Sequence, residues 1–466
     1  MKRIAILLTA VLLSFSATPL WGAQSKGKKT GTRLEPKDIF GLTNIWTVHL
    51  RFTREQWQAM APREVQPNSA SKVSRLQGPE GSRNGAAVSF FGVNFNYVHA
   101  DVEFGTNQFK DVGVRYKGNG TFLSSREDRK RSFKIDLNQF EKGHKLAGMS
   151  QFNLHNSVRD PSGMNEAIAY GLFRAGKVPA PRTAYAKVFV TVPGEHERRY
   201  FGLYTLVEDV GSAFAKEQLG GSTGAILKPV TPNLFADLGD NWKAYNQTYD
   251  PKGSLSEAQK QRVIQFCKFA GKASDAEFAA KLGYYIDVDN FARYMAITAW
   301  LSDLDGILGP GQNFYLYLHP KTQKFMFIPW DQDQTFGQFP RGTDEERETL
   351  NIQKPWTGQN PFLARAFKSD SFKKAYLAAM QEFNASIFLP KRIEAQVDDL
   401  ATLLRGPIQE ESPARLAGLN KAVAGEKVTI NMGPGFSAGT QVKPIKAFVR
   451  ARAKSVSEQL AGAKKG

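Results

Sequence analysis

The feature that most restricts the fold is a change in hydrophobic period partway along the chain. In the first half, apolar residues alternate with polar ones in short runs that are typical of strands (48–52, 102–104, 112–114, 133–137, 184–192 and 201–207). In the second half, apolar residues recur every three or four positions, as in amphipathic helices (288–302, 361–405 and 444–462). Strands followed by helices predict an α+β fold.

Each half should contain one exception to this pattern. The first half should hold one helix, which begins at the capping signal around Asp160. The second half should hold one β-hairpin, in which strands 314–318 and 324–330 are joined by a short polar turn. The Gly-rich stretch 406–443 is expected to be irregular.

The N-terminus predicts export. Lys2 and Arg3 precede a short apolar run that ends in small residues near Ala23, which is the pattern of a signal peptide over residues 1–23. Residues 24–37 are basic and predict a linker. We expect a secreted, periplasmic or cell-surface protein with no transmembrane segment in the mature chain, because no other apolar run reaches about 18 residues. Cys267 is the only cysteine, so no disulfide can form within the chain.

The chain is strongly basic, with 62 Lys and Arg residues against 44 Asp and Glu residues and a net charge of +18. Such a charge fits either a polyanionic partner or a soluble basic surface. The even spread of the charge favours the second, and we expect no nucleic-acid partner. The six histidines form no H-E-x-x-H motif, which excludes that type of zinc site.

Acidic and amide residues bracket the predicted hairpin. Asp303 and Asp305 precede it, Asn313 opens its first strand, and Asp331 and Asp333 follow its second strand. Because a hairpin brings its two ends together, Asp305, Asn313 and Asp331 should meet at one edge of the structure. Hard oxygen ligands of this kind suit Mg²⁺ or Mn²⁺ held jointly with substrate phosphates. The same residue types also fit ordinary turns and caps.

Three other interpretations apply to the second acidic pair. Asp331, Asp333 and Thr335 match the nucleophile motif of haloacid-dehalogenase-type phosphatases, but helices rather than βα units follow the motif here. A calcium EF-hand loop fails because Gly337 takes the seventh position of the loop and Gly342 stands where a glutamate is needed. A glycosidase carboxylate pair is compatible with these residues, but nothing else specifies it.

The densest basic region lies in the first half, in the segments VRYKGNGTF (114–122) and KRSFKIDL (130–137). Lys117 precedes a Gly-containing turn, and Lys134 lies at the centre of a predicted strand. Either lysine could hold phosphates as a point charge. Taken alone, an ordinary solvated strand face explains the pattern better.

The order of these parts is similar to that of a protein kinase, in which a β-rich lobe with a strand lysine precedes a catalytic aspartate, an asparagine, a hairpin and a metal-binding aspartate. More closely, the chain resembles the spore-coat protein H (CotH) kinase family. The matching stretches lie between about residue 100 and residue 460 and include VGVRYKGNGTF, FGLYTLVEDV, DNFARYMAITAWLSDLDG and NFYLYLHPKTQKFMFIPWDQDQTFG. Unlike ordinary kinases, the chain has no G-x-G-x-x-G loop and no H-R-D motif, and D-Q-D replaces D-F-G.

The resemblance implies a bilobal protein-kinase-like fold, with a β-rich N-lobe over residues 38–210 and a mainly helical C-lobe with one β-hairpin over residues 211–463. It also implies a nucleotide site. Lys134 would bind the phosphates and pair with Glu166 on the first helix, and Val207 and Glu208 would form the hinge beside adenine. Lys117 is the competing phosphate binder.

The resemblance further implies the chemistry. Asp305 would orient the acceptor hydroxyl, and Asn313 and Asp331 would hold the metal with support from Asp333. The expected activity is transfer of the γ-phosphoryl group of ATP to a Ser or Thr hydroxyl of a protein substrate, with Mg²⁺ or Mn²⁺. The alternative is a nonenzymatic surface or binding protein on the same fold, an adhesin-like pseudokinase.

Overall fold

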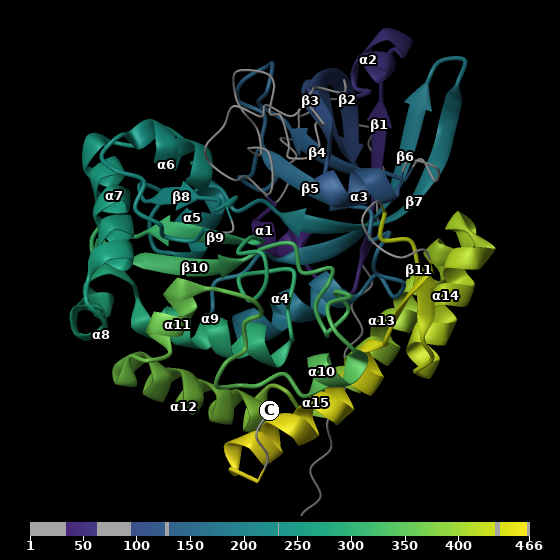
Figure 1. Ribbon diagram of the computed structural model, residues 1–466. Helices are drawn as coiled ribbons and strands as arrows, with labels where there is room; N and C mark the ends of the chain where they lie inside the picture. The colour runs from purple at the N-terminus through teal and green to yellow at the C-terminus, as the bar shows by residue number, and fades with distance from the viewer. Residues whose placement is uncertain (1–33, 63–94, 126–129, 232, 434–438, 464–466) are drawn as a thin grey trace, which may run out of the picture. The chain divides into compact units, whose positions relative to one another are not determined.

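The computed structural model describes residues 34–62, 95–125, 130–231, 233–433 and 439–463 (Figure 1). The predicted signal peptide and residues 24–33 of the predicted linker lie outside these residues. The linker ends earlier than expected, because helix α1 (Pro36–Ile39) begins inside its last two residues. Within the described ranges, no helix combines the length and the apolar character that a membrane crossing requires.

The first half forms a closed seven-stranded barrel. Strand β1 pairs in parallel with β6, and this pairing closes a sheet whose other neighbours are antiparallel. A closed sheet leaves no strand edge exposed. In order around the barrel, the strands are β1 (Ile45–Arg51), β2 (Val98–Phe104), β3 (Asn107–Lys117), β4 (Ser132–Asp136), β5 (Gln151–His155), β7 (His196–Glu208) and β6 (Thr183–Val192).

Alternation along the strands gives the barrel an apolar inside and, on one side, a polar outside. Val114, Phe133 and Leu154 point inward and are fully buried in the barrel core. On the other face of the same strands, Arg115 lies opposite Lys134, which in turn lies opposite Asn153. All three polar side chains are buried. Strands β3 to β5 are therefore covered on both faces.

Helix α4 (Asn165–Ala175) is the helix expected in the first half, but it starts five residues later than Asp160. The Asp160 carboxylate accepts hydrogen bonds from the backbone N–H groups of Ser162 (2.9 Å) and Asn165 (2.8 Å). Asp160 thus satisfies the first N–H of the helix from a preceding turn. The prediction of a single helix was incomplete, because the first half also contains α1 and the short helices α2 (Arg54–Ala59) and α3 (Asn119–Ser124).

The second half is mainly helical and packs around an apolar core that also includes α4, in which Phe291, Tyr294 and Phe327 are buried against one another. Figure 1 shows these helices in teal to yellow. They are α5 (Ser212–Gln218), α6 (Trp242–Tyr249), α7 (Glu257–Lys272), α8 (Asp275–Tyr285), α9 (Val288–Trp300), α10 (Asp344–Glu348), α11 (Pro361–Ala366), α12 (Asp370–Ser386), α13 (Pro390–Glu411), α14 (Pro413–Ala424) and α15 (Ile445–Leu460).

The predicted hairpin is present as β9 (Phe314–Leu318) and β10 (Phe325–Pro329). The prediction of a single hairpin was incomplete, because β8 (Ala225–Leu227) adds to β9 and a second pair forms from β11 (Val428–Ile430) and β12 (Thr440–Val442). These three strands have three residues each, which is too short for a period to show. The expectation of an irregular stretch over 406–443 was also wrong, since α13 continues to Glu411 and α14 follows.

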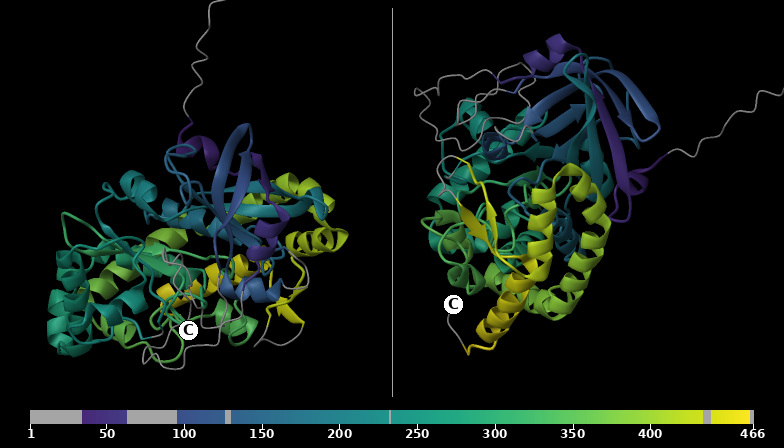
Figure 2. Two further views of the ribbon diagram at one scale, coloured as in Figure 1. Left: turned by 90° about the horizontal axis from the view of Figure 1, so that it is seen from above. Right: turned by 90° about the vertical axis from the view of Figure 1, so that its right-hand side faces the viewer.

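Helix α13 is tied to the barrel at its C-terminal end. Glu411 accepts hydrogen bonds from Lys130 Nζ at both carboxylate oxygens (2.8 Å each) and from the backbone N–H of Leu203 (2.8 Å). Glu411 can come this close to β7 because Gly202 has no side chain and adopts a φ of +123°. Tyr200 adds a hydrogen bond to the backbone oxygen of Pro407 (3.0 Å). Figure 2 shows α13 and α14 side by side next to the barrel.

Candidate functional site

The structure brings together the polar residues at the base of the hairpin. The Trp330 N–H donates to the backbone oxygen of Asn313 (3.1 Å), so Asp331 follows directly beside Asn313. The amide nitrogen of Asn313 donates to Asp305 Oδ2 (3.1 Å) and to the Asp305 backbone oxygen (3.0 Å). Gln312 lies 3.4 Å from the second carboxylate oxygen of Asp305. The meeting of Asp305, Asn313 and Asp331 was predicted from the hairpin alone.

Two of these residues adopt an unusual backbone conformation. Asn313 has a φ of 60° and Asp331 a φ of 56°. Residues other than glycine rarely adopt this left-handed region, although Asn and Asp tolerate it best. Such strain is often retained where it serves a functional geometry.

Five carboxyl groups, which we call the acidic cluster, influence one another here. They are Glu166, Asp303, Asp305, Asp331 and Asp333. Burial and the charges of Asp303 and Asp331 raise the pKa of Asp305 to about 8. Burial also raises the pKa of Asp303 to about 7, and burial with the charges of Asp331 and Glu166 raises the pKa of Asp333 well above its usual value. Carboxylates this close repel one another unless protons or a cation compensate them.

Part of the acidic cluster has the donor set of a metal site. One oxygen each from Glu166 and Asp331 and a ring nitrogen of His155 lie within 4.8 Å of one another. The Tyr170 hydroxyl orders this group, because it accepts from the backbone N–H of Asp331 (3.0 Å) and lies 3.4 Å from Glu166 Oε1. An imidazole and two carboxylates are suitable ligands for a divalent metal ion. The repulsion within the cluster also fits a bound cation.

Lys134 pairs with Asp209, so the prediction of Glu166 as its partner is corrected. Lys134 Nζ lies 3.0 Å from Asp209 Oδ1, and Lys252 Nζ lies 2.9 and 3.1 Å from the two Asp209 oxygens. Burial alone would raise the pKa of Asp209, but the two ammonium groups outweigh it and hold that pKa well below its usual range. The strand register explains the difference. Lys134 lies opposite Asn153, whereas Glu166 bonds His155, two residues further along β5.

Four lysines form what we call the lysine group: Lys117, Lys134, Lys228 and Lys252. Lys134 shares Asp209 with Lys252, and the other three lie near two aromatic rings at the hairpin. Lys252 and Lys228 lie 5.0 and 5.9 Å from the ring centre of Tyr315, and Lys117 lies 5.0 Å from that of Trp330. The two rings pack edge to face with centres 5.2 Å apart. Such cation–π contacts orient ammonium groups without neutralising them.

A chain of contacts connects the lysine group to the acidic cluster. Lys117 Nζ lies 2.5 Å from His155 Nε2, and His155 Nδ1 lies 2.7 Å from Glu166 Oε2. His155 also packs edge to face on Trp330. His155 of β5 therefore contacts both the end of β3, through Lys117, and helix α4, through Glu166.

Val207 and Glu208 do not have the free strand edge of a hinge. Val207 lies opposite Asn153 of β5 on one side and Thr183 of β6 on the other. The Glu208 carboxylate is buried and accepts hydrogen bonds from Arg182. The expected contact of these two residues with adenine therefore has no support in their surroundings.

The sequence analysis missed His155, Asp209, Lys228 and Lys252. The first had a weak signal, because Asn153 and His155 alternate with apolar residues in QFNLH (151–155). Asp209 follows the apolar run of β7, but the resemblance to kinases assigned the hinge role to its neighbour Glu208 and gave Asp209 no role. Lys228 and Lys252 lie in segments without a clear period, so their place at the site depends on the tertiary fold.

The arrangement can hold opposite charges side by side. The acidic cluster can compensate a divalent cation, and the lysine group can compensate an anion next to it. The Asp305 carboxylate is oriented by the amide groups of Asn313 and Gln312. This combination is suited to a metal-bound phosphate ester.

Comparisons with known proteins identify the family of this chain. The family model described as CotH kinase protein matches residues 114–456. The inner spore coat protein H of Bacillus subtilis (strain 168) is 25% identical over 292 residues, which cover 62% of this chain and 75% of that protein. The matched range runs from β3, which carries Lys117, through the acidic cluster to α15. The chain therefore belongs to the CotH kinase protein family.

Proposed function

We propose that this protein is a metal-dependent phosphotransferase with a bilobal, protein-kinase-like fold. The barrel within residues 38–210 would be the N-lobe, and the helical part within 211–463 the C-lobe. It would transfer the γ-phosphoryl group of ATP to a Ser or Thr hydroxyl of a protein. The observation that carries the proposal is the contact between the lysine group and the acidic cluster through Lys117, His155 and Glu166.

The lysine group would bind the phosphates. Lys134 and Lys252 are fixed by one carboxylate, Asp209, and Lys117 is connected to the acidic cluster through His155. Positioned ammonium groups compensate phosphate charge without reorganising during the reaction. Phosphoryl transfer depends mostly on such positioning and on electrostatic stabilisation.

The acidic cluster would hold the metal. Asp331, Glu166 and His155 supply donor atoms within 4.8 Å, and the family resemblance adds Asn313 and Asp333. Mg²⁺ or Mn²⁺ would neutralise charge on the phosphate oxygens. Burial and the repulsion of neighbouring carboxylates raise the pKa of Asp305 and Asp333, and a cation in this place would relieve the repulsion.

Asp305 would accept the proton of the attacking hydroxyl. Its carboxylate is oriented by the amide groups of Asn313 and Gln312. Oriented carboxylates within hydrogen-bond reach of a hydroxyl act as general bases. Its position beside Asn313 and Asp331 would place the acceptor next to the metal.

The test is transfer of labelled γ-phosphate from ATP by the purified full-length protein, to itself and to an added protein acceptor. We expect transfer with Mg²⁺ or Mn²⁺, none with EDTA, and none with Asp331→Asn. We choose Asn because it tolerates the left-handed backbone at this position. The absence of both transfer and ATP binding in the wild-type protein would overturn the proposal.

A nonenzymatic binding protein on the same fold is the second candidate. The observation in its favour is that the Asp305 carboxylate already accepts hydrogen bonds from its neighbours Asn313 and Gln312, as a turn residue would. ATP with Mg²⁺ that raises the melting temperature without any transfer would favour this candidate.

We also propose that the protein acts outside the cytoplasm. The B. subtilis relative is a spore coat protein by name, which supports a surface location. The signal peptide predicted for residues 1–23 supports it independently. The N-terminal sequence of the protein purified from its native source would test the predicted cleavage near Ala23.

A further inference from the structure

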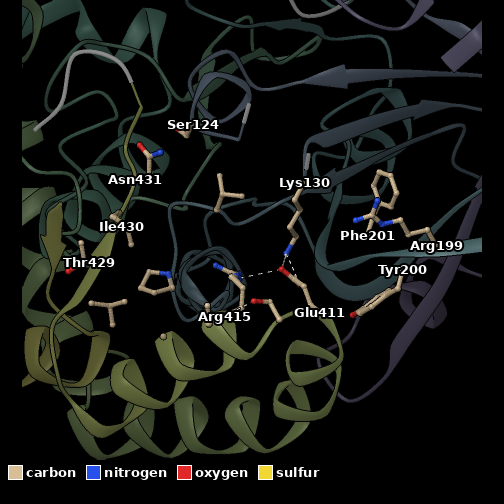
Figure 3. Close-up of a pocket in the computed structure, with 16 residues that line it drawn as sticks. Ser124, Lys130, Arg199, Tyr200, Phe201, Glu411, Arg415, Thr429, Ile430 and Asn431 are labelled. Carbon is tan, nitrogen blue, oxygen red and sulfur yellow. Dashed lines mark hydrogen bonds and ion pairs between the residues drawn. The ribbon is translucent and has the colours of Figure 1, made fainter. Parts of the chain in front are cut away.

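A pocket of about 430 Å³ lies between the barrel, helix α14 and strand β11 (Figure 3). It is lined by residues from β7, from the first turns of α14 and from β11, together with Lys130 and Ser124. None of these residues belongs to the acidic cluster or to the lysine group. The volume is sufficient for a small ligand or for a few residues of a peptide.

The pocket is positively charged. Of the described residues that line it, Lys130, Arg199 and Arg415 carry positive charge and Glu411 carries negative charge. Figure 3 shows Lys130 and Arg415 approaching Glu411 from two sides. The Glu411 side chain is mostly covered in these contacts, whereas Arg199 is exposed. An acidic ligand would therefore meet complementary charge.

One wall of the pocket is the edge of strand β11. Val428 and Ile430 are buried, whereas Thr429 and Asn431 are exposed, so these residues point to opposite faces of the strand. All four line the pocket. Residues from both faces of a strand can border one space only if the strand presents its edge to it. Among the described strands, β11 pairs with β12 alone.

We propose that this pocket docks an extended, acidic peptide segment of a protein partner, which adds as a strand to the edge of β11. Main-chain hydrogen bonds to β11 would supply affinity, and the basic side chains would select acidic residues. Arg159 connects the β11 side of the pocket to the candidate site, because it donates to the backbone oxygen of Met432 (2.6 Å), the residue after Asn431, and its charge acts on Asp305. A docked protein would thus present neighbouring residues near Asp305.

The test measures binding of a fluorescent eight-residue peptide that alternates Glu with Thr, by anisotropy, to the full-length protein without ATP or metal. We expect saturable binding that Arg199→Gln weakens at least fivefold. Arg199 is the first choice because it is exposed, and Arg415→Gln is a second variant inside the pocket. Arg450→Gln on α15 is the matched control, since it removes the same charge from an exposed position outside the pocket.

Three results would overturn the inference. No binding at all would show that the pocket does not accept an acidic peptide. Equal weakening by Arg199→Gln and Arg450→Gln would show that the attraction is that of a basic protein in general. Equal affinity for a version of the peptide with methylated backbone nitrogens would exclude strand addition, because that version cannot donate main-chain hydrogen bonds. Since the assay contains no nucleotide, its outcome is independent of whether the protein transfers phosphate.

Discussion

Lys134 and Asp209 form a buried ion pair, with 3.0 Å between Nζ and Oδ1, at the point where β4 and the end of β7 flank β5. The same carboxylate holds Lys252. A single acidic residue therefore fixes the positions of two ammonium groups that come from distant parts of the chain. This makes Asp209 the residue whose replacement should disturb the lysine group most.

The first prediction is that Asp209→Asn destabilises the protein by roughly 3–5 kcal/mol at pH 7, because it leaves the buried Lys134 and the mostly buried Lys252 without their shared carboxylate. The effect should depend on pH. Since the pKa of Asp209 is lowered in the folded state, its contribution is complete above the ordinary carboxyl pKa and is lost as pH falls toward the folded value. The difference in free energy of unfolding between the two proteins, from urea titrations, should shrink between pH 5 and pH 3.

The matched control is Asp240→Asn, which removes an exposed carboxylate that pairs with Lys268. Exposed pairs contribute little, so this variant should unfold like the wild type. If the difference in free energy of unfolding between wild type and Asp209→Asn grows as the pH falls, the pKa of Asp209 is not lowered in the folded state.

The second prediction concerns phosphate binding. Lys134→Gln and Lys252→Gln should each weaken ATP binding by roughly 10- to 100-fold, because a hydrogen bond to a charged group contributes about 1.5–3 kcal/mol. Lys281→Gln, on an exposed face of α8, should have no effect. Isothermal titration with ATP, and separately with inorganic triphosphate, measures this. If Lys117→Gln abolishes binding while Lys134→Gln does not, Lys117 is the principal phosphate ligand.

The third prediction separates two aspartates by role. Asp331→Asn should lose the Mg²⁺-dependent part of ATP affinity and all transfer. Asp305→Asn should lose transfer but keep metal-dependent ATP binding, because its interaction with the acceptor matters mainly in the transition state. ATP affinity measured with and without Mg²⁺, beside a transfer assay, distinguishes the two. The reverse pattern would exchange the roles.

The fourth prediction tests the tie between α13 and the barrel. A methyl group at Gly202 would lie 2.5 Å from Glu411 Oε2, and the residue has a φ of +123°. Gly202→Ala should therefore destabilise the protein by about 1–3 kcal/mol. Gly171→Ala in α4 is the control, because nothing lies within 4 Å of a methyl group there; it should be neutral or stabilising by up to ~1 kcal/mol. Thermal unfolding of both variants measures the effect. Equal melting temperatures for Gly202→Ala and Gly171→Ala would contradict the close contact between Glu411 and Gly202.

The parts of the site that could be predicted from sequence are those fixed by local geometry. The hairpin specifies that Asp331 and Asn313 meet, because its two strands are joined by a short turn. The partner of Lys134 could not be predicted, since it depends on the pairing of β5 with β7, which are separated by α4 and β6. For the same reason the sequence analysis found the strands of the first half but not their closure, which needs β1 to pair with β6.

Local signals also failed where they were short or contradictory. Strand β8 has three residues and joins β9 only in the folded chain. The Gly-rich composition of 406–443 predicted an irregular stretch, yet α14 forms there with Pro413 at its first position, where no backbone N–H is needed. Pro407 lies inside α13, which continues to Glu411.

The left-handed backbone at Asn313 and Asp331 also limits how this site can change during evolution. At both positions, only Asn, Asp and Gly can be exchanged at low cost, since other side chains add backbone strain. A descendant that no longer needed the metal would reach Asn or Gly at position 331 in one tolerated step. A branched residue there would first require a rebuilt turn. The loss of the chemistry and the loss of the turn are thus separate events, and sequences in which only the first has occurred would retain the fold of the site with an amide in place of the acid.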